Sequence, residues 1–137
     1  MRAVIDTNVL VSGLMKTGTP PAKVIYDLYA RELVPLYDQR ILREYRVVLV
    51  RPTLTRIHLP DAMVLLDFID KRGAEVEGAC CARRLPDPTD QPFADVAFSG
   101  KADLLITGNI RHFPVGDLIR VVTPRQWLDL KASLQGA

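Results

Sequence analysis

Two runs of three apolar residues, each followed directly by a polar side chain, constrain the fold of this chain most strongly. The first run is residues 3–5, followed by Asp6, and the second is residues 104–106, followed by Thr107. Both runs are too short for buried helices, and segments with a helical spacing of apolar residues separate them. This alternation predicts an α/β fold in which crossover helices connect parallel strands.

Similar patterns along the chain predict the other elements of a three-layer α/β/α sandwich with a mostly parallel central sheet. Pro35 restricts its strand to an edge position or places the proline at the strand start. Pro52 predicts the end of the third helix. We expect residues 1–137 to form one domain. The expected strands are 3–5, 33–37, 74–77, 104–106 and 118–122, and the expected helices are one from residue 9, 22–33, 39–50, 60–73, one from residue 93 and one from residue 124.

Composition excludes several classes of protein. Hydrophobic residues make up 48% of the 137 positions, which excludes a disordered chain, and no apolar run approaches the ~20 residues of a membrane helix. Asp6 lies where a signal peptide would still be apolar, so we expect a cytoplasmic protein without membrane association. The adjacent Cys80 and Cys81 are unsuited to a long-loop disulfide or a tetrahedral metal site. The net charge of +2 only weakly favours an anionic partner.

Two polar residues follow the ends of the predicted strands. Asp6 closes the first strand, and Asn109 follows residues 104–106 after a Thr-Gly step. If these strands are parallel neighbours, both side chains reach one crevice beyond the carboxyl ends, where ligands bind in such sheets. Each residue also has a local explanation, because Asp6 suits a helix N-cap and Asn109 suits a turn.

Further acidic residues lie in the predicted helices and before them. Glu44 shares a helix face with apolar residues, where a carboxylate needs a metal or a partner such as Arg40 or Arg43. Asp87 and Asp90 precede the helix from residue 93, and either one suits its cap. Each of these acids has an ordinary explanation when it is considered alone.

The acidic residues are more informative as a set. Carboxylates gathered at a strand end, on a helix and at a helix start repel one another unless a cation lies between them. Oxygen ligands favour Mg²⁺ or Mn²⁺, and the two histidines, His58 and His112, are not spaced as a ligand pair. A cation held by carboxylates is suited to activating water for attack on a phosphodiester.

Three segments in this order resemble the PIN-domain nucleases. They are residues 4–13 (VIDTNVLVSG), residues 85–93 (LPDPTDQPF) and residues 101–109 (KADLLITGN). The likeness is greatest to the VapC-like branch, whose members are regarded as ribonuclease toxins of toxin–antitoxin systems. Residues 124–128 (PRQWL) resemble the closing helix of that branch, so the resemblance covers nearly the whole chain.

The resemblance implies a metal-dependent endoribonuclease, an antitoxin partner and a homodimer. It assigns catalysis and metal binding to Asp6, Glu44 and Asp90. Asn8 and Thr107 would support the site, and Asp87 would be a nearby acid. Many members have an aspartate where this chain has Asn109, which would therefore be a weaker, neutral metal ligand.

Clustered arginines suggest a path for RNA. Arg40, Arg43 and Arg46 lie on the same predicted helix as Glu44, and the planar guanidinium group is suited to phosphate. The alternatives are a solvated helix face or charges that only balance Glu44.

Two other functions compete with the nuclease. A non-cleaving RNA- or protein-binding module of the same fold is favoured by the neutral Asn109. A phosphoryl-transfer domain with Asp6 as the nucleophile would need a second aspartate two positions later, or an acidic pair before the strand together with a later lysine at a strand end. Asn8 occupies the first of these positions, and no suitable lysine follows the later strands.

Overall fold

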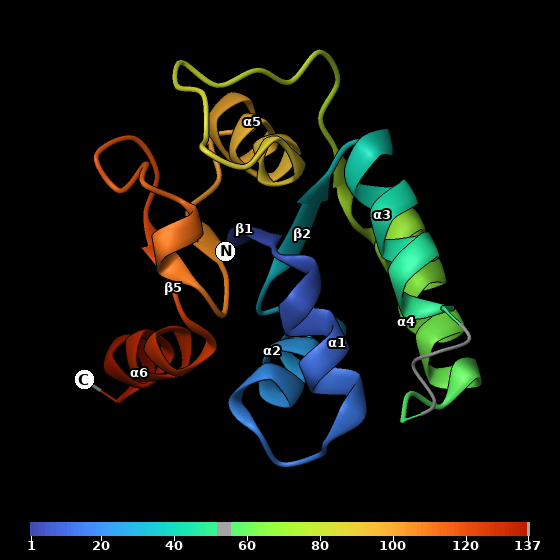
Figure 1. The fold of residues 1–137 in the computed structure, drawn as a ribbon. Coiled ribbons are helices and arrows are strands. Elements are labelled where there is room, and N and C mark those ends of the chain that lie inside the picture. The colour runs from blue at the N-terminus through green and yellow to red at the C-terminus, as the bar shows by residue number, and fades with distance from the viewer. Residues whose placement is uncertain (52–55, 137) are drawn as a thin grey trace.

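The computed structural model describes residues 1–51 and 56–136, and a five-stranded sheet lies at its centre (Figure 1). The strand order is β3-β2-β1-β4-β5, and every strand pair in the described residues is parallel. The predicted α/β fold with a parallel central sheet is therefore confirmed. The strands are β1 (Arg2–Ile5), β2 (Val34–Tyr37), β3 (Ala74–Glu75), β4 (Leu104–Ile106) and β5 (Val121–Val122).

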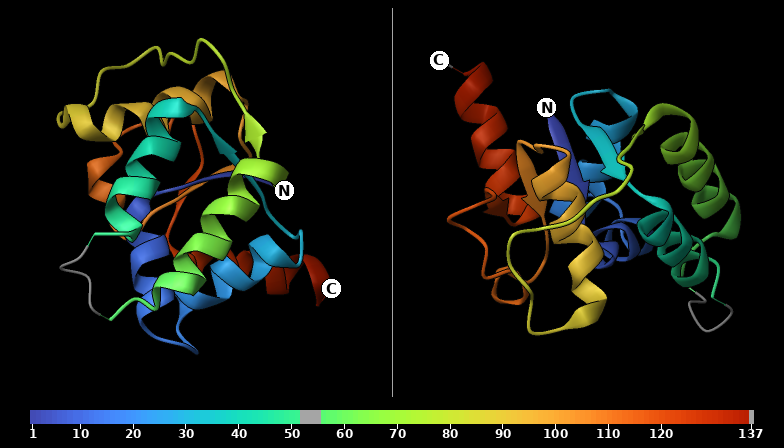
Figure 2. Two further views of the ribbon diagram at one scale, coloured as in Figure 1. Left: turned by 90° about the vertical axis from the view of Figure 1, so that its right-hand side faces the viewer. Right: turned by 90° about the horizontal axis from the view of Figure 1, so that it is seen from above.

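Helices cover both faces of this sheet. In Figures 1 and 2, α5 lies on one side of the strands, α1, α2 and α6 lie on the other, and α3 and α4 run side by side next to β2. The α-helices are α1 (Thr7–Met15), α2 (Pro20–Tyr29), α3 (Gln39–Leu49), α4 (Leu59–Arg72), α5 (Gln91–Ser99) and α6 (Pro124–Gln135), with short 3₁₀ turns at Pro88–Asp90 and Ile110–His112.

The central strand β1 explains why the carboxyl ends of the strands meet. Residues 3–5 are completely buried, as expected for a strand that has helices on both faces. Ile5 pairs with Ile106 of β4, and the backbone N–H of Asp6 donates to the Ile106 carbonyl at 2.9 Å. Asp6 and Thr107 are therefore neighbours, although 101 residues separate them in the sequence.

Three expected strands differ from those observed. β3 contains only Ala74 and Glu75, whereas the pattern predicted residues 74–77. β5 contains only Val121 and Val122, whereas the pattern predicted residues 118–122. β2 is an interior strand, and Pro35 lies near its start, where it pairs with Ala3 of β1 before the pairing with β3 begins at Leu36. The missing N–H of Pro35 therefore falls outside the β3 ladder.

Helix α2 ends at Tyr29 instead of continuing to residue 33. The N–H of Arg31 donates to the Leu28 carbonyl at 3.1 Å, and that of Glu32 donates to the Asp27 carbonyl at 2.9 Å. These two bonds form a Schellman motif, in which the chain leaves the helix through a left-handed residue, here Arg31 with φ 61°. Helix α3 ends at Leu49, and Pro52, which predicted this end, lies outside the described residues.

Among the described residues, we find no helix with the length and apolar character needed to span a bilayer.

Candidate metal centre

Asp6 lies at the junction of β1 and α1 and is 7% exposed. It occupies the predicted N-cap position, where its backbone carbonyl accepts from the Val9 N–H at 3.0 Å. Its carboxylate makes no capping hydrogen bond to the described residues of α1. It accepts instead from the Thr107 hydroxyl, at 2.7 Å between Thr107 Oγ1 and Asp6 Oδ2. The cap is therefore a backbone feature, and the Asp6 carboxylate is directed to the end of β4.

Glu44 reaches the same region from α3. Its Oε2 accepts from the hydroxyl of Thr7, the first residue of α1. The neighbouring Tyr45 is buried, and its hydroxyl donates to the carbonyl of Ile5. These two bonds hold α3 against the end of β1. Because Thr7 is the partner that the structure gives Glu44, the predicted pairing of Glu44 with Arg40 or Arg43 is not observed.

Asp90 brings a third carboxylate from the turn before α5. Its Oδ2 atom is buried and has no hydrogen-bond partner in the described part of the chain. The nearest basic atom is His112 Nδ1, at 3.5 Å from this oxygen. Asp87 behaves differently, because it is exposed and accepts from the Thr89 N–H at 2.9 Å and the Thr89 hydroxyl at 2.8 Å. Asp87 therefore stabilises the turn that presents Asp90.

The three carboxylates influence one another electrostatically. Burial raises the pKa of Asp6, the charges of Asp90 and Glu44 raise it further, and the Thr107 hydrogen bond opposes them. Burial also raises the pKa of Asp90, with contributions from Asp87 and Glu44, whereas His112 lowers it. Asp6, Glu44 and Asp90 thus lie close enough for their charges to act on one another, and their assignment to one metal site stays a prediction.

The donors of this cluster fit a hard divalent cation. All are carboxylate oxygens, and Asp90 Oδ2 is buried without a partner among the described residues. In the same part of the chain, no group of three or more His, Cys, Asp or Glu side chains is placed so that it could hold a metal ion. Mg²⁺ suits such a site, because it keeps several waters and often takes only one or two protein carboxylates.

The remaining predicted residues lie around the cluster. Asn8 is exposed, and its Oδ1 accepts from the Gly108 N–H at 3.4 Å, which connects the start of α1 to the loop after β4. The backbone N–H of Asn109 donates to Thr107 Oγ1 at 3.0 Å. Position 109 is therefore one hydrogen bond away from the hydroxyl that contacts Asp6.

The three arginines of α3 differ in their surroundings. Arg40 lies 2.7 Å from Asp38 and 3.1 Å from Asp95, and Arg46 lies 3.2 Å from Asp70. Arg43 is exposed and forms no ion pair within residues 1–51 and 56–136. Carboxylates other than Glu44 thus neutralise two members of the predicted RNA path.

Sequence analysis missed Thr7 and Tyr45 as residues that position the cluster. Both occur within matched or patterned segments, but their roles depend on hydroxyl contacts with Glu44 and Ile5 across 37 and 40 residues. Sequence spacing does not indicate contacts at such separations. The sequence indicated their roles only through their positions, because Thr7 directly follows Asp6 and Tyr45 directly follows Glu44.

Comparisons with known proteins concern the family and the fold of this chain. A model of the PIN domain matches residues 2–111. A solved structure, described as VapBC2 from Rickettsia felis bound to a DNA fragment from their promoter, superimposes with a TM-score of 0.59 and 16% identity. The alignment covers 90% of this chain and 98% of that one, and at this identity it shows a shared fold. No curated protein matches the chain.

Proposed function

This chain belongs to the PIN-domain family, and from that premise we propose that it is a metal-dependent endoribonuclease acting at the cluster of Asp6, Glu44 and Asp90. PIN domains are generally nucleases that use divalent metal ions. The observation that carries the proposal is the buried Asp90 Oδ2, which has no hydrogen-bond partner in the described residues and belongs to a cluster of three mutually repelling carboxylates. A bound cation would give Asp90 Oδ2 a partner and would reduce the repulsion among the three carboxylates.

The residues of the proposed site have distinct roles. Asp6, Glu44 and Asp90 would hold Mg²⁺ or Mn²⁺, with Asn109 as a neutral fourth oxygen donor, and the ion when bound would activate water for attack on a phosphodiester. The hydroxyls of Thr107 and Thr7 orient Asp6 and Glu44. Asn8 connects the start of α1 to the loop after β4 by accepting a hydrogen bond from the Gly108 N–H. Asp87 stabilises the turn that presents Asp90.

Arg43 is the best-supported contact for the RNA backbone. It is exposed one position before Glu44 on α3, and it has no ion pair within the described residues. Arg40 and Arg46 would contribute to the path only if their carboxylate partners released them. We therefore propose that Arg43 dominates this part of the RNA path.

The structural match supports a biological role. Because that structure contains VapBC2 with promoter DNA, we propose that this chain is the toxin of a toxin–antitoxin system, inhibited by an antitoxin protein. We further propose that residues 1–137 act as one domain, that the chain forms a homodimer, and that it cleaves its RNA in the cytoplasm.

The central test is cleavage of a defined RNA pool by the purified protein with Mn²⁺, with Mg²⁺ and with a chelator. We expect cleavage only with metal. Asp6→Asn removes one proposed ligand and should lower the cleavage rate more than about 100-fold, because even outer contacts of metal ligands contribute that much. Asp129→Asn is the matched control, since this exposed aspartate of α6 lies outside the cluster and its variant should cleave normally.

Two outcomes would contradict this assignment. Full cleavage activity of the Asp6→Asn variant would show that Asp6 is not needed for catalysis and would contradict the assignment of the cluster as the active site. Metal-independent binding of RNA without cleavage by the wild-type protein would favour the non-cleaving module, which the neutral Asn109 makes the second candidate.

A further inference from the structure

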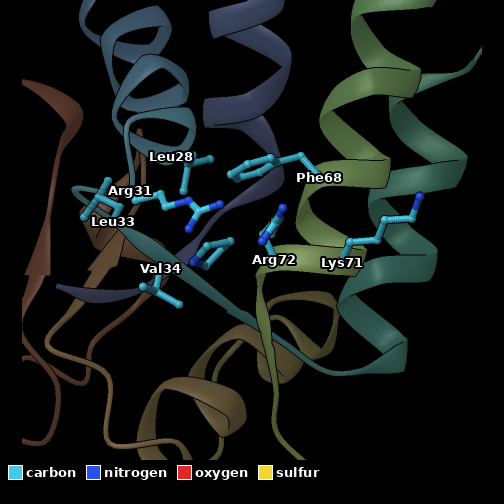
Figure 3. Close-up of a pocket in the computed structure, with 8 residues that line it drawn as sticks. Leu28, Arg31, Leu33, Val34, Phe68, Lys71 and Arg72 are labelled. Atoms are coloured by element: carbon cyan, nitrogen blue, oxygen red, sulfur yellow. The ribbon is translucent and has the colours of Figure 1, made fainter.

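A pocket of about 340 Å³ lies where α2 and α4 end and β2 begins. Figure 3 shows it beside the first residues of β2, whereas Asp6 follows the carboxyl end of β1. Because β1 and β2 are parallel and each has four residues, the two ends lie roughly 13 Å apart along the strands. The pocket is therefore separate from the proposed metal centre.

Three basic residues line this pocket. In Figure 3 the guanidinium groups of Arg31 and Arg72 extend into the space between α2 and α4, whereas the ammonium group of Lys71 points away. Lys71 Nζ lies 3.1 Å from Asp67 Oδ1. Neither arginine has an ion pair or hydrogen bond from its side chain to any residue of the described chain. Two like charges that share one space repel each other unless an anion joins them.

The backbone of Arg31 adds a second, independent observation. Arg31 adopts φ 61° at the position after the α2 cap, where glycine is strongly favoured because it lacks a Cβ. Strained residues of this kind cluster at binding sites, where their side chains are needed. A glycine would end α2 without this cost, and Lys101, which follows the cap of α5, is the other non-glycine residue with a positive φ in the described chain.

The rest of the pocket is apolar and closely packed. Leu28 and Leu33 are buried, and the half-buried Phe68 packs edge-on against Tyr29, with 4.9 Å between ring centroids. Gly73 holds the end of α4 against β2, since a Cβ there would lie 2.8 Å from the carbonyl oxygen of Pro35. The close packing of Gly73 against β2 therefore fixes the backbone position of the preceding residue, Arg72.

We propose that Arg31 and Arg72 form a binding site for the phosphate group of a phosphate ester, whose organic part packs against the half-buried Phe68. Two guanidinium forks are suited to binding one phosphate through paired hydrogen bonds. The volume is at the lower end of the range for small-molecule pockets, which suits a nucleoside monophosphate or one nucleotide of an RNA strand. The competing explanation is that both arginines only complement the dipoles at the ends of α2 and α4.

The test is a calorimetric titration of the wild-type protein at constant ionic strength, with a chelator present so that the metal centre neither binds nor cleaves. The probes are adenosine 5′-monophosphate and a short RNA. We expect saturable binding of the monophosphate, weakened about tenfold or more in Arg72→Gln, because one charge-assisted contact is lost. Lys23→Gln is the matched control and should bind as the wild type does, because this exposed cation of α2 does not line the pocket.

Arg31→Gly separates the proposal from the dipole explanation. It should weaken phosphate binding as Arg72→Gln does and raise the melting temperature by about 3 °C, since it relieves the left-handed strain. Loss of binding to the monophosphate alone identifies a free phosphate ester as the ligand, and a parallel loss of RNA affinity identifies the RNA backbone. No binding by the wild type, or equal binding by wild type, Arg31→Gly and Arg72→Gln, would overturn the proposal.

Discussion

Two buried aspartates in this molecule have opposite surroundings. Asp27 of α2 is 2% exposed, and its carboxylate accepts from Trp127 Nε1 at 2.8 Å and from Lys131 Nζ at 2.7 Å, both in α6. Asp6 is 7% exposed, and its carboxylate accepts from the neutral Thr107 hydroxyl and faces the charges of Asp90 and Glu44.

The difference separates a structural carboxylate from a proposed functional one. A buried charge is costly unless it is paired, and the fold supplies Asp27 with a cation from its own chain. It surrounds Asp6 with further acids. An arrangement of that kind is stable only if a cation comes from solution or if protons neutralise part of the cluster.

The largest effect on stability should come from removing the paired aspartate. Asp27→Ala leaves the Lys131 ammonium and the Trp127 indole N–H without their acceptor, so we expect a loss of about 3 kcal/mol in the free energy of unfolding. Chemical denaturation with and without a chelator measures it. The matched change at the other site, Asp6→Ala, should leave the metal-free protein unchanged or more stable. Equal destabilisation by both variants would remove the distinction between the two sites.

An intermediate effect should come from adding an acid to the unpaired cluster. Asn109→Asp places a fourth carboxylate at the position whose backbone bonds Thr107. We expect Mn²⁺ affinity to rise about tenfold and the metal-free protein to lose stability. Calorimetric titration of Mn²⁺ and metal-free melting curves measure the two parts separately. An unchanged Mn²⁺ affinity would show that the Asn109 side chain is not a ligand in the proposed metal centre.

The smallest effect should be the contribution of the unpaired cluster to the pH dependence of stability. The pKa values of Asp6 and Asp90 are raised in the folded protein, mainly by burial, above the ordinary value of 3.8. Between the unfolded and folded values the folded protein binds more protons, so these residues favour folding at acidic pH, and their contribution declines as pH rises through the folded values.

Metal-free melting curves between about pH 4 and 7 test this sign. Subtracting the curve of Asp6→Asn from that of the wild type isolates the contribution of Asp6 from the other titrating groups. That difference should favour the wild type more at the acidic end. A difference that grows toward neutral pH would mean that the folded protein stabilises Asp6 as an anion, and it would contradict the raised pKa.

The sequence predicts the parts of this molecule that depend on local patterns. The apolar runs at residues 3–5 and 104–106 place Asp6 and Thr107 at strand ends, and parallel pairing then brings them together. The cap of α3 by Asp38 and the Thr7–Glu44 contact escaped prediction, because side-chain hydrogen bonds leave no periodic pattern.

Long-range ion pairs escaped prediction for a related reason. Arg40 meets Asp95 across 55 residues and Asp27 meets Lys131 across 104, and no spacing rule connects such positions. The end of α2 was misplaced because Arg31 adopts the left-handed conformation, which a sequence pattern assigns to glycine or asparagine.

The central position of β1 has a consequence for biosynthesis. β1 is synthesised before the other strands of the sheet, whereas its neighbour β4 lies about 100 positions later in the chain. Pairings over such distances close slowly, because the loop entropy must be overcome before the contacts form. A nascent chain stopped before β4 therefore carries Asp6, Glu44 and Asp90 but lacks the strand that pairs with β1 and the Thr107 hydroxyl that bonds Asp6. The proposed site is thus assembled only after translation has passed residue 107.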